Sequence, residues 1–525
     1  RRLPTELPPL TAFERAGRDR GFDAPLRNFL VDALISSDAT GSSLAPLVHE
    51  FRTATSKLRP RAVTGVVRGG IDLVLANRGG ILIAGWLDDP HDLTVGLQLL
   101  RRDRPVNIDG AALLRFRHAS IDRDGRGASG FLCRAAAAVD GDLPASIRIS
   151  VRLGSGEMIE LGDGPSVIPP RAQLTRLLAH CANITLGPCS LAAMLHPVAR
   201  HAASAQSEPC AIELRDIGPV SLQTPTSLLA PFGGDLELLR ARSTAFALDR
   251  SLADVEIVHV LEDPRRAPEA TALLRMHAEL YGRGTRLAIA QRPSSMRDAL
   301  NATVTRLATP RLVLLDADTL PEASGWLDAL AHALAAHPRA GMVAARILNE
   351  DDSLVDAGYS RAVGTDGQSR LVTRLAGFPR GFADGDQAAR VDAVSGGAWM
   401  MRRSLFELIG GFANDYLTAF GADGDFCRRV GAAGFELLQL AAPAFHRLGA
   451  KPVVTGEEIA HELDQLSLAA RWPIVETTRT VETLAVSPTL GEAEQPAPQP
   501  LSAEEPQPPP SNTSKRRHRR SRRAA

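Results

Sequence analysis

Between about Ile212 and Gly449 the sequence alternates short apolar runs with stretches of helical periodicity, and few folds are compatible with this order. Strand-like runs such as GPVSLQTP, VEIVHVL, TRLAIAQ and RLVLL are separated by segments with apolar residues every three or four positions. Strands joined by crossover helices lie parallel, with the helices on both faces of the sheet. We therefore expect an α/β domain with a mostly parallel sheet, whose ligands bind at the carboxyl ends of the strands.

A different pattern precedes this region. Residues 63–168 contain short β-branched runs, such as GILIAGWL and SIRISVRL, interrupted by Gly, Asp or Pro, which is typical of an antiparallel β-sandwich. Residues 1–62 and 169–211 have helical periodicity. The expected order is a helical segment (1–62), a β-sandwich accessory domain (63–168), a helical connector (169–211), the α/β domain (212–472) and a disordered Pro-rich linker with a basic tail (473–525).

Length and composition limit the class of protein. The 525 residues are enough for two or three domains with separate cores. Five cysteines without CxxC spacing support neither a zinc site nor a disulfide framework, so a reducing compartment fits. No apolar run approaches the ~18 residues of a membrane span. Aromatic residues, at 4%, are too sparse to favour a nucleic-acid module based on stacking. We expect a cytoplasmic protein.

The run RLVLLDADTLPEASGWL ends a strand-like segment in two carboxylates, Asp316 and Asp318. Residues i and i+2 of an extended chain point to the same side, so the two carboxylates repel each other unless a cation lies between them. A hard divalent cation, which prefers carboxylate oxygens and shares its shell with phosphates, would satisfy the pair. Asp also begins turns and caps helices, and the local sequence alone favours neither interpretation.

A later block, residues 391–449, contains several motifs in a fixed order. They are a Gly-rich segment with Gly396 and Gly397, the short helix SLFELIGGF, the acidic motif ADGDFCRRV and the late His446. Together with the Asp-x-Asp and with RDALNATVTRLATPRLVLLDAD, this series resembles the family 2 glycosyltransferases over roughly half of the chain. Several ordered motifs are far more specific than one. The segment GGILIAGWLDDP is also similar to the small sandwich modules that precede some bacterial enzymes of this kind.

The resemblance implies a glycosyltransferase-A fold, Rossmann-like, and an inverting single displacement at the anomeric carbon. In such a reaction a sugar hydroxyl must lose a proton and a nucleoside diphosphate must leave with its charge neutralised. By position in the family pattern, Asp423 is the general base. Asp318 and His446 are the expected ligands of a divalent metal, Mn²⁺ or Mg²⁺, and Asp316 binds the ribose or supports the metal.

The resemblance also implies the binding partners. They are a nucleotide-sugar donor and a glycan or lipid-linked acceptor, in surface polysaccharide assembly. Besides Asp316, the residues expected to bind the donor are Glu262, Asn301, Gly396 and Gly397. The donor sugar, its nucleotide, the acceptor and the oligomeric state do not follow from the sequence.

Several residues depart from the family pattern. Leu261, Glu262 and Asp263 stand where paired aspartates are usual, Ser295 stands at a position that is commonly Gly, and Ala422 precedes Asp423 in place of an acidic or amide residue. These departures leave open how the nucleobase of the donor is recognised. They also leave a second hypothesis open, namely a non-catalytic carbohydrate- or nucleotide-binding protein on a degenerate glycosyltransferase fold.

Each site residue also has a purely structural alternative. Asp423 and Asp425 could cap a helix, with Asp425 orienting the base or pairing with Arg428 or Arg429, and His446 could be an ordinary histidine. The glycines could simply permit a tight turn. Trp86, in the predicted sandwich, is more often a core residue than a sugar platform, so we assign it no site.

The terminal run SKRRHRRSRRAA carries seven Lys or Arg residues. For an enzyme with membrane-borne acceptors, attraction to anionic lipid at the inner face of the plasma membrane fits best, at about 1 kcal/mol per basic residue. A merely solvated terminus is an equal alternative, and sequence-independent binding of nucleic acid is the less favoured one.

Overall fold

The computed structural model of the chain describes residues 67–473, apart from short gaps. The gaps are residues 90, 102–103, 118–127, 137–147, 164–169, 183, 206–209, 221–223, 292, 294, 365–366, 384–387 and 450–455. The predicted helical segment (1–62) and, apart from residue 473, the predicted linker and basic tail lie outside the described residues. No helix in the described part is long and apolar enough to cross a membrane.

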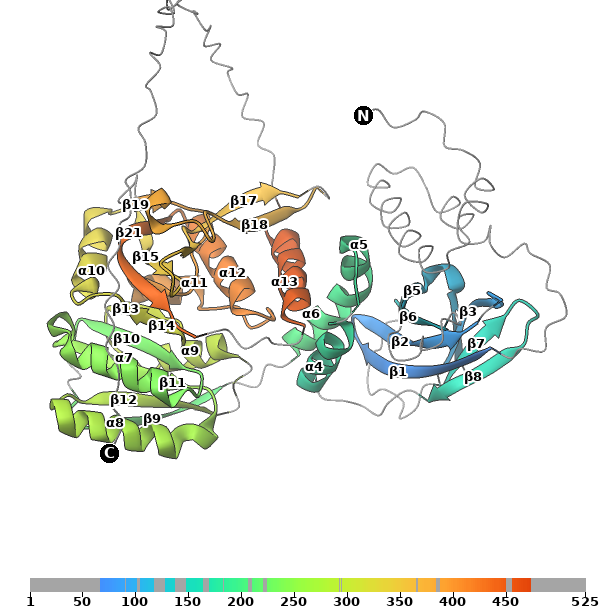
Figure 1. Cartoon of the computed structure of the whole chain (residues 1–525), viewed down its shortest axis with the longest axis horizontal. Coiled ribbons are helices and arrows are strands. Elements are labelled where there is room, and N and C mark those ends of the chain that lie inside the picture. Colours follow the sequence, from blue (N-terminus) through green and yellow to red (C-terminus); the bar gives the residue numbers. More distant parts are fainter. Residues whose placement is uncertain are drawn as a thin grey trace, which may run out of the picture. The chain divides into compact units, whose positions relative to one another are not determined.

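Two antiparallel four-stranded sheets form the first part of the described chain (Figure 1). Their orders are β1-β2-β6-β5 and β4-β3-β7-β8. The bounds are β1 (Arg68–Asn77), β2 (Gly80–Asp88), β3 (Thr94–Arg101), β4 (Arg104–Asp109), the 3₁₀ turn η2 (Gly110–Ala112), β5 (Leu114–Arg117), β6 (Ala128–Ala135), β7 (Arg148–Leu153) and β8 (Met158–Asp163). Ile83 and Phe131 of one sheet share a buried cluster with Leu97 and Val151 of the other. The two antiparallel sheets therefore share one buried core, which suggests a sandwich without establishing the predicted accessory domain.

Helices follow the second sheet and pack on the outer face of the first. They are α4 (Pro170–Cys181), α5 (Pro188–Ser190), the π-helix η3 (Leu191–Leu195) and α6 (His196–Ser204). Leu177 and Val198 from these helices lie in one cluster with Leu73 and Leu82 of the sheet. Leu463 of the last described helix, α13 (Glu457–Arg471), joins the same cluster. The region expected to be a helical connector therefore contacts both the first sheet and α13.

The rest of the described chain is a mixed α/β domain on one large sheet, with the order β14-β21-β15-β20-β13-β10-β11-β12-β9. Its centre is a parallel block, β12-β11-β10-β13, joined in sequence by crossover helices. The bounds of this part are β9 (Ala211–Ile217), β10 (Thr226–Phe232), α7 (Leu236–Leu248), η4 (Arg250–Leu252), β11 (Val255–Leu261), η5 (Pro264–Arg266), α8 (Ala267–Tyr281), β12 (Thr285–Gln291), α9 (Met296–Val304) and β13 (Arg311–Leu315).

Beyond β13 the sheet continues with both parallel and antiparallel neighbours. β20 is antiparallel to β13 and β15, whereas β21 runs parallel to β15. The bounds are β14 (Thr319–Pro321), α10 (Trp326–Ala336), β15 (Ala340–Leu348), β16 (Leu354–Asp356), the hairpin β17 (Tyr359–Val363) and β18 (Ser369–Thr373), η6 (Arg380–Ala383), β19 (Ala388–Arg390), β20 (Ala398–Arg402), α11 (Arg403–Ile409), α12 (Ala419–Ala432) and β21 (Glu436–Arg447).

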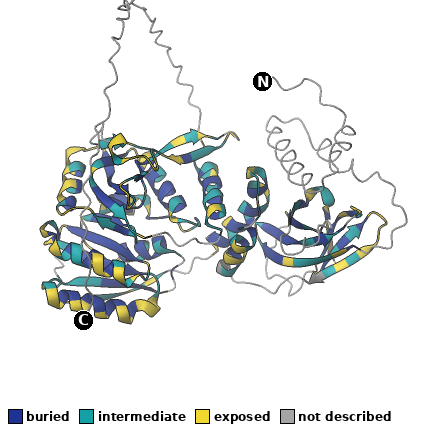
Figure 2. Cartoon of the chain, viewed as in Figure 1, coloured by how far each residue is buried: buried dark blue, intermediate teal, exposed yellow. Residues whose placement is uncertain are grey.

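Both faces of the central strands are buried (Figure 2). Leu228 of β10 and Val313 of β13 point into a cluster with α7 and α10, whereas Leu229 and Leu312 point into a cluster with α9, α11 and α12. Successive side chains of a strand face opposite sides, so a strand covered on both faces must be apolar throughout. This explains why these strands appear in the sequence as continuous apolar runs.

The predicted strand GPVSLQTP, residues 218–225, falls between β9, which ends at Ile217, and β10, which begins at Thr226. Residues 221–223 of this segment lie outside the described residues, and the described residues on either side of them are not in a strand. Gly218 has a φ of 74°, a left-handed conformation that interrupts an extended chain, and Pro219 lacks the N–H that a strand ladder needs.

Candidate active site

The Asp-x-Asp turn follows the carboxyl end of β13 and is held by backbone contacts. Asp316 N–H donates to the carbonyl of Gly397 at 3.2 Å, and Thr319 Oγ1 donates to the carbonyls of Asp316 and Gly397. Arg242 of α7, fully buried, donates through Nη1 to the Asp316 carbonyl at 2.9 Å and through Nη2 to the Pro231 carbonyl. Burial lowers the pKa of Arg242 to about 10, against the pull of Asp318 and Asp316. The turn is therefore clamped between two strand ends.

Asp423 lies in the second turn of α12 and does not cap it. The N-cap is Thr418, whose Oγ1 accepts from Gly421 N–H at 3.2 Å. Buried Asp464 of α13 in turn accepts from the Thr418 N–H and hydroxyl. Because these groups supply the cap, the carboxylate of Asp423 is free of that structural task. Its position on the helix directs it toward the end of β13.

Asp425, two residues later, is a structural centre. Its carboxylate accepts from Arg429 Nε at 2.8 Å, Tyr416 Oη at 3.2 Å, Trp472 Nε1 at 3.0 Å and Arg471 Nη1 at 3.1 Å. The pair with Arg429 is one of those considered from the sequence. These contacts join α12 to α13 and to the loop before α12.

A buried arginine joins the two halves of the site. Arg297 of α9 donates from Nε to Asp423 Oδ1 at 2.7 Å and from Nη2 to Asp423 Oδ2 at 2.6 Å, and its Nη2 lies 3.3 Å from Asp316 Oδ1. The guanidinium also stands over the ring of Phe412. Burial acts to lower the pKa of Arg297, but Asp423 and Asp316 raise it further, so it stays charged. One guanidinium thus holds two carboxylates together.

The pKa of Asp423 is raised to about 6. Burial is the largest cause, Arg297 opposes it, and Asp316 adds to it. Gly396 approaches this group so closely that a Cβ there would lie 2.4 Å from Arg297 Nη2 and 2.6 Å from Asp423 Oδ2. Glycine is needed at position 396 because a side chain would not fit there, and not because of its backbone conformation.

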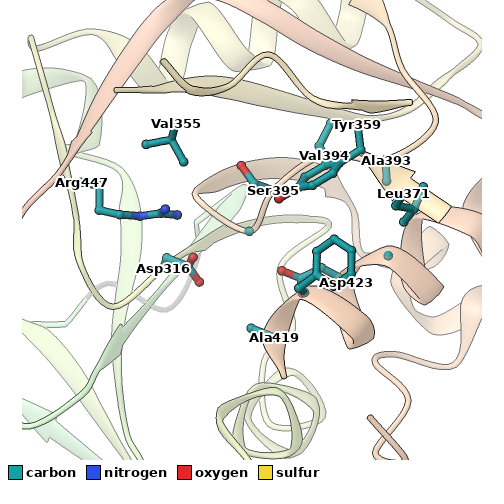
Figure 3. A pocket seen from close by; sticks show the side chains of 13 residues that line it. Asp316, Val355, Tyr359, Leu371, Ala393, Val394, Ser395, Ala419, Asp423 and Arg447 are labelled. Carbon is teal, nitrogen blue, oxygen red and sulfur yellow. The ribbon is translucent and has the colours of Figure 1, made fainter. Parts of the chain in front are cut away.

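A cavity of about 120 Å³ opens beside these residues (Figure 3). Asp316, Ser395, Asp423 and Arg447 line it together with Tyr359. In Figure 3 the guanidinium of Arg447 extends toward Asp316. Pockets that enclose a drug-sized ligand usually measure about 300–1,000 Å³. The cavity can therefore hold only part of a nucleotide sugar.

The two expected metal ligands make separate contacts. Asp318 Oδ2 lies 3.4 Å from Arg447 Nε, whereas His446 Nε2 lies 2.9 Å from Asp352 Oδ1. His446 and Arg447 are consecutive in β21, so their side chains point to opposite faces of the sheet. As placed, the residues do not fit the metal that the resemblance implies, because an arginine occupies the side of Asp318 where the histidine was expected.

Within the described residues, the ligand atoms of Glu322, Asp352 and His446 do lie within 4.8 Å of one another. Arg380 already neutralises this group, with Nη1 2.8 Å from Glu322 Oε1 and 3.9 Å from Asp352 Oδ1. The group of Glu322, Asp352 and His446 also contains neither aspartate of the Asp-x-Asp turn.

The other residues expected to bind the donor have varied surroundings. Asn301 donates to the carbonyl of Phe412 and accepts from its N–H, both at 2.8 Å, so its side chain anchors the loop before α12. A Cβ on Gly397 would lie 2.2 Å from Ile347 Cδ1, so this glycine serves close packing. Glu262 follows the carboxyl end of β11, is partly exposed and does not line the cavity.

Three arginines of the site were not identified from the sequence. They are Arg242, Arg297 and Arg447. Single arginines among the chain's many basic residues carry no local pattern, and each reaches its partner only through the packing of distant elements.

No protein-family model matches the sequence, and no curated protein matches it. The structure is similar to that of GalNAc-T7 with UDP, GalNAc and Mn²⁺ (15% identity, 43% of this chain, 44% of that chain, TM-score 0.34). It is similar to mannosyltransferase PcManGT from Pyrobaculum calidifontis in complex with GDP-Man and Mn²⁺, with 16% identity over 57% of this chain and 76% of that chain and a TM-score of 0.34. It is also similar to S. aureus TarS 1-349 in complex with UDP-GlcNAc, with 10% identity over 45% of this chain and 61% of that chain and a TM-score of 0.33. The chain spans less than half of the GalNAc-T7 structure, and at such TM-scores these likenesses support no argument about function.

Proposed function

We propose that this chain is an inverting glycosyltransferase that transfers a sugar from a nucleotide-sugar donor to a glycan or lipid-linked acceptor, in surface polysaccharide assembly. The main support is one observation: Asp316 and Asp423, from opposite halves of the domain, contact the same guanidinium and line the same cavity. The motif series that resembles family 2 glycosyltransferases is the second support. In this proposal Asp316 faces the donor and Asp423 faces the acceptor hydroxyl.

In the proposed reaction, the acceptor hydroxyl oxygen forms a bond to the anomeric carbon as the bond from that carbon to the diphosphate oxygen breaks. The hydroxyl proton passes to a carboxylate oxygen of Asp423, and the nucleoside diphosphate leaves with the bonding electrons. Attack opposite to the leaving group inverts the anomeric configuration. A single displacement needs one base, and the proposal assigns this role to Asp423, which lines the cavity.

The environment of Asp423 suits this role. A general base is most effective when its pKa lies near the working pH, and the pKa of Asp423 is raised to about 6. At neutral pH the carboxylate is therefore ionised, yet more basic than an exposed aspartate. Arg297 keeps it ionised and oriented, although both oxygens must share their lone pairs with the incoming hydroxyl.

A second candidate, a non-catalytic nucleotide- or carbohydrate-binding protein, is favoured by one specific observation. Arg297 donates to both oxygens of Asp423, so in this arrangement the base is engaged in a bidentate ion pair. A binding protein could keep such a pair permanently, whereas an enzyme must let the acceptor hydroxyl reach one oxygen.

Calorimetry and turnover assays together separate the two. We expect the purified chain to bind one of the UDP, GDP, dTDP or CDP sugars and to release the nucleoside diphosphate. Asp423→Asn keeps the shape of the side chain but removes the base, so it should retain donor binding and lower turnover by about 10²–10⁴-fold.

Asp328→Asn, on the exposed face of α10, is the matched control and should leave both properties unchanged. Donor binding without turnover in the wild-type chain would favour the binding protein. Absence of binding to all of these sugars would refute the transferase and leave only a carbohydrate-binding protein.

A further inference from the structure

The proposed transfer requires a positive charge beside the donor diphosphate. The diphosphate is anionic and gains charge as it leaves, so the aspartates of the Asp-x-Asp turn cannot bind it unaided. Two kinds of cation could lie between them, a divalent metal ion held by Asp318 or a protein side chain. The described residues around the turn distinguish these possibilities.

The backbone around Arg447 is hydrogen-bonded to the Asp-x-Asp turn and to the strand that follows it. Arg447 is the last residue of β21 and pairs with Thr319 of β14, whose hydroxyl bonds to the Asp316 carbonyl. The next N–H along the chain, that of Leu448, donates to the Asp318 carbonyl at 2.8 Å. The backbone of Arg447 is thus fixed to the Asp-x-Asp turn from both sides. Its guanidinium reaches the cavity and lies against the Asp318 carboxylate.

A simple rotation would not bring His446 into this place. His446 is on the opposite face of β21, so exchanging the two side chains requires a register shift of one residue. Such a shift would also remove the neighbouring Phe445 from the core, where it is fully buried with its ring 5.1 Å from that of Trp326. The packing of Phe445 therefore determines that an arginine faces Asp318.

We propose that the guanidinium of Arg447, and not a divalent metal ion, supplies the positive charge that binds the donor diphosphate. This inference rests on the proposed function and deepens it, because it makes donor binding independent of metal. A guanidinium presents a planar fork of N–H donors that matches phosphate oxygens and stays charged at every physiological pH. Without donor, Nε of this group lies 3.4 Å from Asp318 Oδ2, and phosphate oxygens accept hydrogen bonds from the guanidinium when the donor binds.

The test is calorimetry of the full chain with UDP, GDP, dTDP, CDP and their sugars, in excess EDTA and then in excess Mn²⁺. We expect equal affinity, within about twofold, in the two conditions. Arg447→Gln should weaken binding roughly ten- to a hundredfold, as expected for lost hydrogen bonds to a charged group. Arg447→Lys, which keeps the charge but not the fork, should lie between the two.

Two controls accompany these variants. His446→Gln should leave binding unchanged, because its side chain faces Asp352. Arg339→Gln removes an exposed arginine that pairs with Glu436 and not with the Asp-x-Asp turn, so it should also leave binding unchanged. The thermal unfolding midpoint of each variant shows whether it is folded, and the comparison of EDTA with Mn²⁺ on the unaltered chain needs no variant.

Nucleotide binding that appears only with Mn²⁺ would overturn the inference while leaving the proposed function intact, and its loss in His446→Gln would identify His446 as a metal ligand. Affinity unchanged by Arg447→Gln in EDTA would overturn it as well. Absence of nucleotide binding with and without Mn²⁺ would overturn the proposed function together with the inference.

Discussion

Replacing Arg297 by Met should destabilise the protein in a way that depends on pH. Arg297 is buried with two carboxylates, and removal of one partner from a buried ion pair typically costs about 3–5 kcal/mol. The folded pKa of Asp423 is about 6, above its ordinary value of 3.8. Between these pH values the unfolded chain has lost the proton while the folded protein still holds it. The free energy of unfolding therefore falls by about 3 kcal/mol as pH rises through this window. Arg297 limits this loss because it lowers the pKa.

Without the guanidinium the pKa of Asp423 rises further, since burial and Asp316 remain. The stability of the variant should therefore fall relative to wild type as pH rises above about 6. Each unit of additional pKa shift adds about 1.4 kcal/mol to the difference. Urea unfolding of both proteins at about pH 5 and about pH 8 measures it. Near pH 5 Asp423 is largely protonated in both proteins, so the variant should be least affected there.

Two further variants sharpen this test. Arg339→Met removes an exposed arginine and should change stability by less than about 0.5 kcal/mol at either pH. Arg297→Met combined with Asp423→Asn should lose the pH dependence that comes from Asp423. If Arg297→Met is destabilised equally at both pH values, or more at the lower one, the guanidinium is not what keeps Asp423 ionised and the reasoning is refuted.

Three other outcomes are expected. Gly396→Ala should lower turnover at least tenfold in steady-state assays, because the added Cβ would collide with the ion pair of Arg297 and Asp423. Gly431→Ala is the control, because this helical glycine has no neighbour within 4 Å, and it should be harmless or stabilise the protein by up to about 1 kcal/mol in thermal unfolding. Asn301→Ala should cost about 1–3 kcal/mol in urea unfolding, because the N–H and carbonyl of Phe412 lose their partners, and an unchanged midpoint would contradict this anchoring role. Deleting residues 515–523 should reduce flotation with anionic vesicles but not with neutral ones, and retention of vesicle binding would exclude the tail as the membrane contact.

Much of the α/β fold was predictable from local sequence. Helix α7 coincides with the periodic run LELLRARSTAFAL, β12 with TRLAIAQ and β11 with VEIVHVL, because crossover helices and doubly covered strands have strong local patterns. The strand expected to begin at Gly218 does not begin there, since this left-handed glycine interrupts the extended chain after β9. The antiparallel additions to the sheet were also not foreseen, because strand pairing depends on contacts between residues far apart in sequence.

The sequence alone determined that Asp316 and Asp423 belong to one series of motifs, because each lies beside a local pattern of strand, glycine or helix start. Only the tertiary structure decided what they face. Arg297 and Asp423 are 126 residues apart, and no local rule joins them. In the pair His446–Arg447, a difference of one residue decides which side chain meets Asp318. That choice follows from the register of β21, which the burial of Phe445 sets, and register is a property of the packed sheet.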